Sequence, residues 1–265
     1  MKICTFNVNS IRVRKDLIAD WLNHRGQDID ILCFQELKSV SEDFPFKDFE
    51  NMGFACEVFG QKTYNGVAIC SRIQLKDIQK GFGDSVWDEQ SRLIAVKTKD
   101  LVLINVYAPH GGLRGEEKFD YKREWYKRFI SFLDSSYSPK DSVLIVGDCN
   151  VAKEDMDVFD PEALKDTIGT MPEEREAFQE LLNWGFTDVF RHLYPDRIQY
   201  TWWDYIGGAI WKNEGMRIDY ALCTKPLVNK VKDVEVDIWP RRRQSPKPSD
   251  HAPVIATLDL SKTKS

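Results

Sequence analysis

Short apolar runs recur along the whole chain, and nine of them predict β-strands. Together the runs are rich in Val and Ile and are bounded by Gly, Pro, Asp or Asn, as buried strands usually are. Three other segments place apolar residues on one helical face, around residues 17–22, 119–133 and 177–182; the last follows Pro172, which favours a first helical turn. The predicted strands are residues 2–8, 31–34, 66–70, 92–98, 101–107, 143–147, 218–223, 231–238 and 254–260.

Strands and helices interleave irregularly along the chain. The connection between 92–98 and 101–107 is so short that it predicts a hairpin. This pattern indicates an α/β fold with mixed sheets covered by helices, and not a strict βαβ repeat. With 265 residues, 42% of them hydrophobic, and no low-complexity linker or repeat, one domain spanning 1–265 is expected.

The chain shows no sign of a membrane or secreted protein. No apolar stretch is long enough to cross a membrane, and the first predicted strand begins at Lys2, which leaves no room for a leader segment. The six cysteines include no CxxC pair and mostly lie in apolar runs, so reduced, buried thiols are expected and a disulfide framework is not. A cytoplasmic protein without a membrane partner is predicted.

A polar or aromatic side chain stands at one end of six predicted strands. One such end is common, because strands stop at the surface. Six of them, drawn from Asn, Glu, Tyr, Asp and His, suggest that the strand ends converge on one catalytic surface. The residues are Asn7, Glu36, Tyr107, Asp148 with Asn150, Asp219, and Asp250 with His251.

These side chains suit a magnesium site. Carboxylate and amide oxygens are the ligands that Mg²⁺ prefers, whereas zinc usually takes Cys and His, so Glu36 and Asn7 favour Mg²⁺. Asp148 and Asn150 alternate along an extended segment and therefore share a face. Asp148 could deprotonate a water while Asn150 donates to the attacked group, or the two could simply close the strand as an Asx turn.

The four histidines differ in context. Asp219 could fix the tautomer of His251 and hold it as an imidazolium facing phosphate oxygens. His24 and His192 lie on predicted helical segments and are expected to be structural, while His110, three residues after Tyr107, is ambiguous.

The net charge of −5 argues against a broad surface that coats nucleic acid. Basic residues nevertheless flank the acidic candidates, at 12–15 and within 240–248. Taken alone, residues 241–243 predict a solvated loop; their position beside Asp250 and His251 favours phosphate contact instead.

Six short motifs, in this order, resemble those of the exonuclease III family of abasic-site endonucleases. Each motif is weak by itself, but chance would rarely order all six. The stretches 172–176 and 184–192 add to the similarity, which covers essentially the whole chain. The motifs are Phe6-Asn7-Val8-Asn9-Ser10-Ile11-Arg12, Gln35-Glu36-Leu37-Lys38, Asn65-Gly66-Val67-Ala68, Gly147-Asp148-Cys149-Asn150, Arg217-Ile218-Asp219 and Pro248-Ser249-Asp250-His251-Ala252-Pro253.

The resemblance implies a DNase I-like fold, a four-layer α/β sandwich of two packed mixed β-sheets flanked by helices. It also implies that Glu36, assisted by Asn7 and Asp250, binds Mg²⁺, with Mn²⁺ as an alternative. By the same resemblance, Asp148 with Asn150 activates water, Tyr107 and His251 contact the scissile phosphate, Asp219 is the partner of that histidine, and Asn9, Arg12 and Lys38 contact DNA or support the site.

The resemblance further implies an apolar pocket for a flipped sugar that lacks its base, formed by Trp202, Met216 and Ile218. Ile206 stands where the family pushes a residue into the duplex, and His110 where it usually has a substrate-contacting amide. One of Trp202 and Trp203 is expected to belong to the core. Leu37, Cys149, His110 and Met216 depart from the common family residues. Of these, His110 and Met216, together with Ile206, leave open the balance of endonuclease, 3′-exonuclease and 3′-phosphatase activities.

We therefore predict a Mg²⁺-dependent DNA repair nuclease that cuts 5′ to abasic sites and leaves a 3′-hydroxyl and a 5′-deoxyribose phosphate. Exonuclease activity in the 3′→5′ direction and 3′-phosphatase or phosphodiesterase activity are expected beside it. The expected partner is double-stranded DNA with abasic sites or blocked 3′ ends, bound by a monomer. Two alternatives stay open: a phosphodiesterase or phosphatase of the same fold acting on RNA ends or an inositol phosphate, and a non-catalytic nucleic-acid-binding protein.

Overall fold

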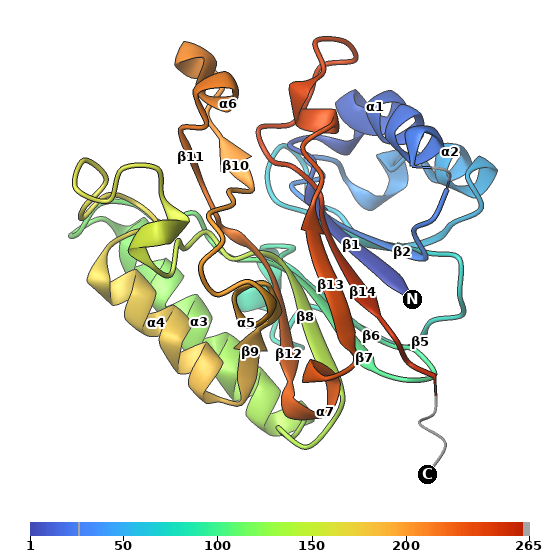
Figure 1. Ribbon diagram of the computed structural model, residues 1–265. Coiled ribbons are helices and arrows are strands. Elements are labelled where there is room, and N and C mark those ends of the chain that lie inside the picture. The colour runs from blue at the N-terminus through green and yellow to red at the C-terminus, as the bar shows by residue number, and fades with distance from the viewer. Residues whose placement is uncertain (26, 262–265) are drawn as a thin grey trace.

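The computed structural model describes residues 1–25 and 27–261, and its main feature is a pair of six-stranded mixed β-sheets (Figure 1). The first sheet has the order β13 (Val231–Val236), β14 (Val254–Leu258), β1 (Lys2–Asn7), β2 (Ile31–Gln35), β4 (Val67–Ser71) and β3 (Ala55–Phe59). The second has the order β5 (Lys76–Lys80), β6 (Leu93–Lys97), β7 (Val102–Tyr107), β8 (Val143–Asp148), β12 (Asp219–Thr224) and β9 (Phe186–Asp188). Only β1 with β2 and β7 with β8 pair in parallel among the described strands.

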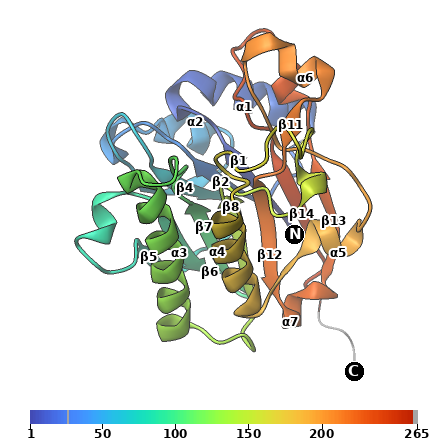
Figure 2. The ribbon, with the colours of Figure 1, turned by 90° about the vertical axis from the view of Figure 1, so that its left-hand side faces the viewer.

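Helices cover the outer face of each sheet (Figures 1 and 2). Helices α1 (Ile11–His24) and α2 (Phe46–Asn51) pack on the first sheet, where Trp21 and Phe49 join its apolar side chains. Helices α3 (Glu117–Ser136) and α4 (Pro172–Asn183) pack on the second sheet through Phe129 and Phe178. A third core lies between the sheets, so the predicted four-layer sandwich is confirmed.

Shorter elements complete the fold. They are α5 (Val189–Leu193), α6 (Ala209–Lys212), α7 (Lys225–Val228), β10 (Trp202–Trp203) and β11 (Gly215–Met216). Strands β10 and β11 form a two-stranded ribbon that stands above the second sheet and carries α6 at its tip (Figure 1).

All nine predicted strands are present, with ends that shift by at most two residues. The three predicted helices correspond to α1, α3 and α4. Five strands were not predicted: β3, β5, β9, β10 and β11. Strand β5 is exposed along most of its length, and β9–β11 have only two or three residues, so none of these shows an apolar run.

The expectation that all six cysteines are reduced is wrong for one pair. Cys56 on β3 and Cys70 on β4 are directly opposite in the antiparallel register and form a disulfide. Their separation of 14 residues gives no hint of this pairing, which depends on the register of an unpredicted strand. The remaining cysteines, Cys4, Cys33, Cys149 and Cys223, are free and buried as predicted.

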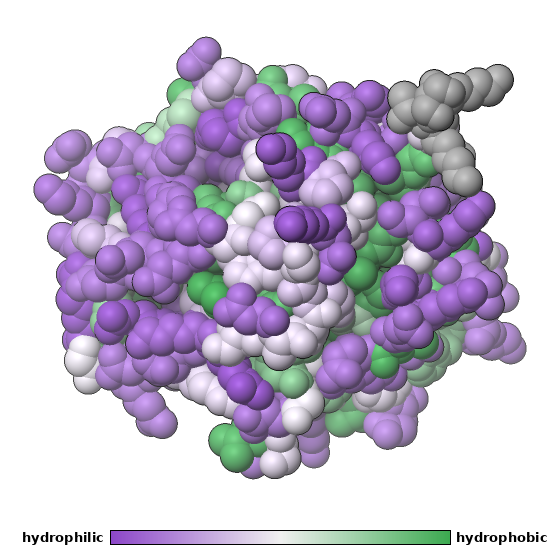
Figure 3. Space-filling view, turned by 90° about the horizontal axis from the view of Figure 1, so that it is seen from below, coloured by the Kyte–Doolittle hydropathy of each residue, from purple (hydrophilic) through white to green (hydrophobic). Residues whose placement is uncertain are grey.

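Among the described residues, no helix combines the length and the apolar character needed to cross a membrane. Seen from the end of the molecule where α7 lies, the surface is mostly hydrophilic, and hydrophobic residues are interspersed with charged ones (Figure 3).

Candidate active site

The polar strand ends from both sheets converge. In the first sheet, the parallel pairing of β1 and β2 places Asn7 beside Gln35, so Glu36 leaves the sheet next to it. In the second sheet, the parallel pair β7–β8 sets Tyr107 opposite Asp148, and antiparallel β12 sets Asp219 opposite Asp148 from the other side. The side chains from the two packed sheets therefore face one another at the same end of the sandwich.

One hydrogen-bonded bridge joins the two halves of the site. The Asn7 side-chain nitrogen donates to Glu36 Oε1 and to Asp148 Oδ2, each at 2.9 Å. The Asn7 amide oxygen accepts from the backbone N–H of Asn9 at 3.0 Å. Asn7 thus presents its nitrogen to the carboxylates, and it would have to turn its amide over to act as the predicted oxygen ligand.

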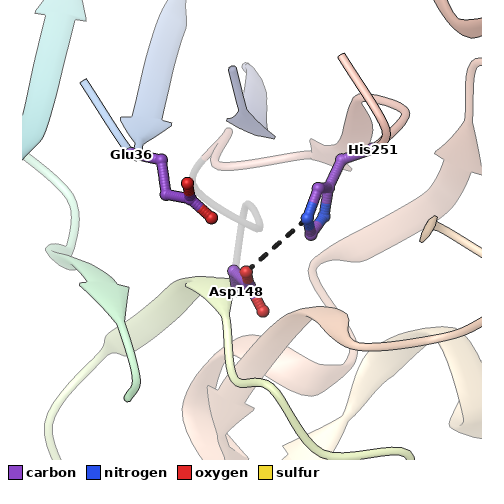
Figure 4. A group of neighbouring side chains, drawn as sticks. All are labelled: Glu36, Asp148 and His251. Carbon is purple, nitrogen blue, oxygen red and sulfur yellow. Dashed lines mark ion pairs between the residues drawn. The ribbon is translucent and has the colours of Figure 1, made fainter. Parts of the chain in front are cut away.

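Glu36, Asp148 and His251 form the one cluster of potential metal-binding side chains within the described residues. One ligand atom from each lies within 4.8 Å of the others, and all three side chains point into a common space (Figure 4). Asp250, the other predicted ligand, lies beside this cluster. Its Oδ1 accepts from Asn9 and its Oδ2 from Trp202, at 2.9 and 3.1 Å.

Asp219 and Asp148 hold His251 in its charged form. His251 Nδ1 is 2.9 Å from Asp219 Oδ2, and His251 Nε2 is 3.8 Å from Asp148 Oδ2. Burial lowers the pKa of His251, but Asp219 and then Asp148 outweigh it and raise the pKa from 6.5 to about 10. The predicted imidazolium, paired with Asp219, is therefore what this geometry favours.

The two carboxylates of the cluster differ in their acidity. Burial and the neighbouring Asp219 raise the pKa of Asp148 to about 7, against the opposing effect of His251. Burial also favours the protonated form of Glu36, yet the hydrogen bond from Asn7 and the ammonium of Lys38, 2.9 Å away, bring its pKa below the ordinary value. Glu36 is thus an anion while Asp148 can exchange a proton near neutral pH.

Asn150 forms the Asx turn that its motif left open as one alternative. Its backbone N–H donates to Asp148 Oδ1 at 2.9 Å, which is the Asx turn, and its φ of 52° is left-handed. Its side-chain nitrogen donates to Ala108 O at 2.9 Å and so lies against the segment after β7. The turn places Asn150 on the same cavity as Asp148.

Tyr107 is a buried hydroxyl donor. Its pKa is raised by burial and by the negative charges of Glu36 and Asp148, so the phenol keeps its proton. Behind it, the Arg92 guanidinium lies 5.0 Å from the ring centroid and donates to Tyr107 O at 3.1 Å.

These residues surround a cavity of about 400 Å³. Two of its lining residues, Ile168 and Gly169, were not predicted, because they lie in an irregular segment with no distinctive pattern. A side chain at Gly169 would crowd the cavity wall, since a Cβ there would be 3.3 Å from Asn150 O and 3.4 Å from Met216 Cε. The lining residues are Glu36, Tyr107, His110, Asp148, Asn150, Ile168, Gly169, Trp202, Met216, Ile218, Asp250 and His251.

The remaining predicted substrate contacts lie around this cavity. Lys38 donates to Asn9 Oδ1 at 2.7 Å, and Arg12 lines a neighbouring groove with Lys38. Ile206 is 79% exposed before α6, and with Trp202 it borders an adjoining apolar cavity. Trp203 is the buried member of the tryptophan pair, so one of the two belongs to the core, as predicted.

The basic segment near His251 is divided. Arg241 is buried and donates to the carbonyls of Trp203, Asp204 and Asp250, so it braces the loop and is neither solvated nor free for phosphate. Arg242 and Arg243 are exposed. His24, at the end of α1, stacks on Trp239, in keeping with its expected structural role.

Comparison with known proteins places the chain in a family. Residues 4–251 match the Endonuclease/Exonuclease/phosphatase family. An exodeoxyribonuclease from Bacillus subtilis (strain 168) is 32% identical over 98% of this chain and 100% of its own length. The DNA repair nuclease APEX1 of Danio rerio is 34% identical over 97% of this chain and 82% of its own length. The chain therefore belongs to the endonuclease/exonuclease/phosphatase family, and its predicted resemblance to exonuclease III is confirmed.

Solved structures give the same result. An AP endonuclease from Archaeoglobus fulgidus superposes with a TM-score of 0.92 at 38% identity, covering 98% of this chain and 99% of that one. The 3′ phosphatase NExo from Neisseria, bound to a product DNA hairpin, superposes with a TM-score of 0.91 at 38% identity and the same coverage.

Proposed function

We propose that this protein is a metal-dependent DNA repair nuclease that hydrolyses the phosphodiester 5′ to an abasic site. The products are a 3′-hydroxyl and a 5′-deoxyribose phosphate, and 3′→5′ exonuclease and 3′-phosphatase or phosphodiesterase activities accompany this reaction. The observation that carries the proposal is the Glu36–Asp148–His251 cluster, held on one cavity in a chain whose relatives are exodeoxyribonucleases and AP endonucleases.

The two carboxylates of the cluster, Glu36 and Asp148, fit a hard divalent cation, Mg²⁺ or Mn²⁺. Glu36 is an anion, and Asp148 offers a second carboxylate within reach of the same point. Asn7 and Asp250 stand next to them as the further predicted ligands. When bound, the cation supplies positive charge beside the scissile phosphate.

Different residues of the protein then have different roles in hydrolysis. Asp148, whose pKa is raised to about 7, accepts the proton of the attacking water. The His251 imidazolium and the Tyr107 hydroxyl donate to phosphoryl oxygens as negative charge builds on them. The bond between phosphorus and the 3′ oxygen breaks, and that oxygen takes a proton from solvent water to become the 3′-hydroxyl. Asp219 holds the His251 ring in place, and Asn150 orients the group under attack.

The cavity size and its apolar wall support abasic DNA as the substrate. A cavity of about 400 Å³ walled by Trp202, Met216 and Ile218 can accept a sugar without a base, whereas an intact nucleotide brings more bulk. Ile206 enters the duplex as a wedge. Asn9, Arg12, Lys38 and His110 contact the DNA around the cut.

We further propose that residues 1–265 act as one domain and as a monomer in the cytoplasm. The core between the two sheets takes side chains from both halves of the chain, which supports a single folding unit. The interspersed polar surface in Figure 3 supports the monomer on that face.

A duplex with one tetrahydrofuran abasic analogue tests the function. We expect incision 5′ to the analogue with Mg²⁺ and none with EDTA. Turnover of inositol phosphates or RNA ends without incision would favour a phosphodiesterase of another specificity. Duplex binding without cleavage of any substrate would favour a non-catalytic binding protein.

A further inference from the structure

Lys122 on α3 and Glu174 on α4 form a buried ion pair outside the catalytic cluster. Lys122 Nζ lies 2.6 Å from Glu174 Oε1, and the two side chains are 1% and 0% exposed. Removing two charges from water is unfavourable unless their remaining polar atoms are also bound. The other partners of the pair therefore indicate what it does.

The Lys122 ammonium joins two walls of the cavity. Besides Glu174, it donates to His110 O at 3.1 Å and to Asn150 O at 2.6 Å. His110 follows Tyr107 after β7, and Asn150 follows Asp148 after β8. All three N–H donors of one buried ammonium are thus used, and two of them fix the backbone beside catalytic side chains.

Glu174 fixes a third wall. Its Oε2 accepts from the backbone N–H of Gly169 at 2.6 Å and of Met171 at 3.2 Å. Gly169 lines the cavity next to Asn150. The carboxylate therefore connects the 168–171 segment, through Lys122, to the backbone that carries Asp148.

We propose that the Lys122–Glu174 pair is a positioning element, which sets the spacing of the three cavity walls for the reaction. Neither residue touches the cavity, so both act through the segments they hold. The two charges could not exchange places. Lys122 supplies N–H donors to the two backbone carbonyls, and Glu174 supplies an acceptor to the two backbone N–H groups. This inference rests on the proposed nuclease function and assigns a role to the 172–176 motif, which that function leaves without one.

Glu174→Gln is the sharpest test, because it keeps the shape of the side chain. In one orientation the amide NH₂ of the new Gln faces the Lys122 ammonium, and in the other it faces the Gly169 N–H. Two hydrogen-bond donors cannot bond to each other, so one wall of the cavity must shift. Glu173→Gln is the matched control: Glu173 pairs at 2.7 Å with Arg114, and both side chains are partly exposed. The Glu173→Gln variant removes the same negative charge one residue away, and Glu173 does not contact the cavity walls.

The readout is the single-turnover rate constant on the tetrahydrofuran duplex, with enzyme in excess and Mg²⁺ present. Because misplacement by about 1 Å can cost about 10²-fold, we expect Glu174→Gln to slow cleavage at least about tenfold. The reaction should still run to completion, and duplex affinity in EDTA should stay within about twofold, since the basic groups that contact phosphates are unchanged. A rate for Glu174→Gln equal to that of Glu173→Gln overturns the inference.

A charge-swapped variant separates positioning from simple joining of the helices. Lys122→Glu with Glu174→Lys keeps an ion pair between α3 and α4 but turns an acceptor toward the carbonyls and donors toward the N–H groups. We expect no recovery of the rate; full recovery would mean that the pair only links two helices.

Hydrogen exchange gives a readout that does not depend on activity. The Gly169 and Met171 amides should exchange faster in Glu174→Gln than in Glu173→Gln, and equal protection would contradict the proposed contact. If the wild-type protein cleaves no DNA substrate, the proposed function fails, while the exchange result still decides whether the pair holds the walls.

Discussion

In the proposed mechanism, Asp148 is the residue whose ionisation controls the activation of water. Its carboxylate is fully enclosed, bonded to Asn7 and to the Asn150 backbone, and its raised pKa comes from burial and Asp219. We expect Asp148→Asn, which keeps the size of the side chain but cannot take a proton, to slow cleavage about 10²–10⁴-fold. Single-turnover cleavage measures this. Asp141→Asn, an exposed aspartate before β8, is the control, and equal rates for the two variants would remove Asp148 from its role.

The charge of His251 can be followed directly. We expect its ring protons to titrate in NMR spectra of the metal-free protein with a midpoint near 10, and Asp219→Asn to bring that midpoint down. Because the folded pKa lies above the ordinary 6.5, this group's contribution to stability is complete below 6.5 and is lost as the pH rises to about 10. A midpoint near 6.5 in the unaltered protein would contradict the Asp219–His251 pairing.

At the scale of elements, a buried polar network joins the two sheets beneath the site. The Asn105 side-chain nitrogen, from β7, donates to Phe34 O on β2 and Ala68 O on β4, at 3.0 and 2.9 Å. Gln35 donates back to Asn105 Oδ1 at 2.6 Å. This network sets how the strand ends of one sheet face those of the other.

Asn105→Ala removes all three of these hydrogen bonds between the sheets. We expect the free energy of unfolding to fall by about 1–3 kcal/mol, measured by urea denaturation. Asn229→Ala, at an exposed position after α7, should change it by less than about 0.5 kcal/mol. Similar values for the two variants would show that Asn105 does not join the sheets.

The elements that the sequence predicts are those with a local signal. Strands β2, β7 and β8 were predicted because burial on both faces leaves a mostly apolar run. Strand β5 has the opposite character, being charged and exposed at a sheet edge. The Cys56–Cys70 disulfide and the Lys122–Glu174 pair depend on register and helix packing, which local sequence does not encode.

At the scale of the whole molecule, most of the predicted site residues line one cavity, but the wall formed by Ile168 and Gly169 was not foreseen. Glu36, Asp148 and His251 stand at strand ends, where their position follows from the sheet. Ile168 and Gly169 belong to a loop that tertiary contacts hold in place: the Gly169 N–H donates to Glu174 Oε2, and Gly169 O accepts from the Ala152 N–H. The side chains at strand ends could thus be predicted from the sequence, whereas the conformation of the loops around the cavity depends on tertiary contacts.

The protein carries a net charge of −5, but basic residues lie beside the candidate site. We therefore expect DNA to bind at these basic residues. Arg12 is an exposed side chain in the groove beside Lys38. We expect Arg12→Ala to weaken duplex binding and to reduce the slope of log affinity against log salt by about 1, by fluorescence anisotropy in EDTA. Lys225→Ala on α7, at the end of the molecule shown in Figure 3, should leave the slope unchanged. The same slope for Arg12→Ala and wild type would place the DNA elsewhere.

Cleavage of the tetrahydrofuran duplex in H₂¹⁸O, followed by mass spectrometry of both fragments, tests the central claim most directly. Attack by a water at the phosphorus 5′ to the analogue predicts one ¹⁸O atom in the 5′-phosphate of the downstream fragment and an unlabelled 3′-hydroxyl upstream. A label on the upstream 3′ end, or cleavage with no label in either fragment, would contradict it.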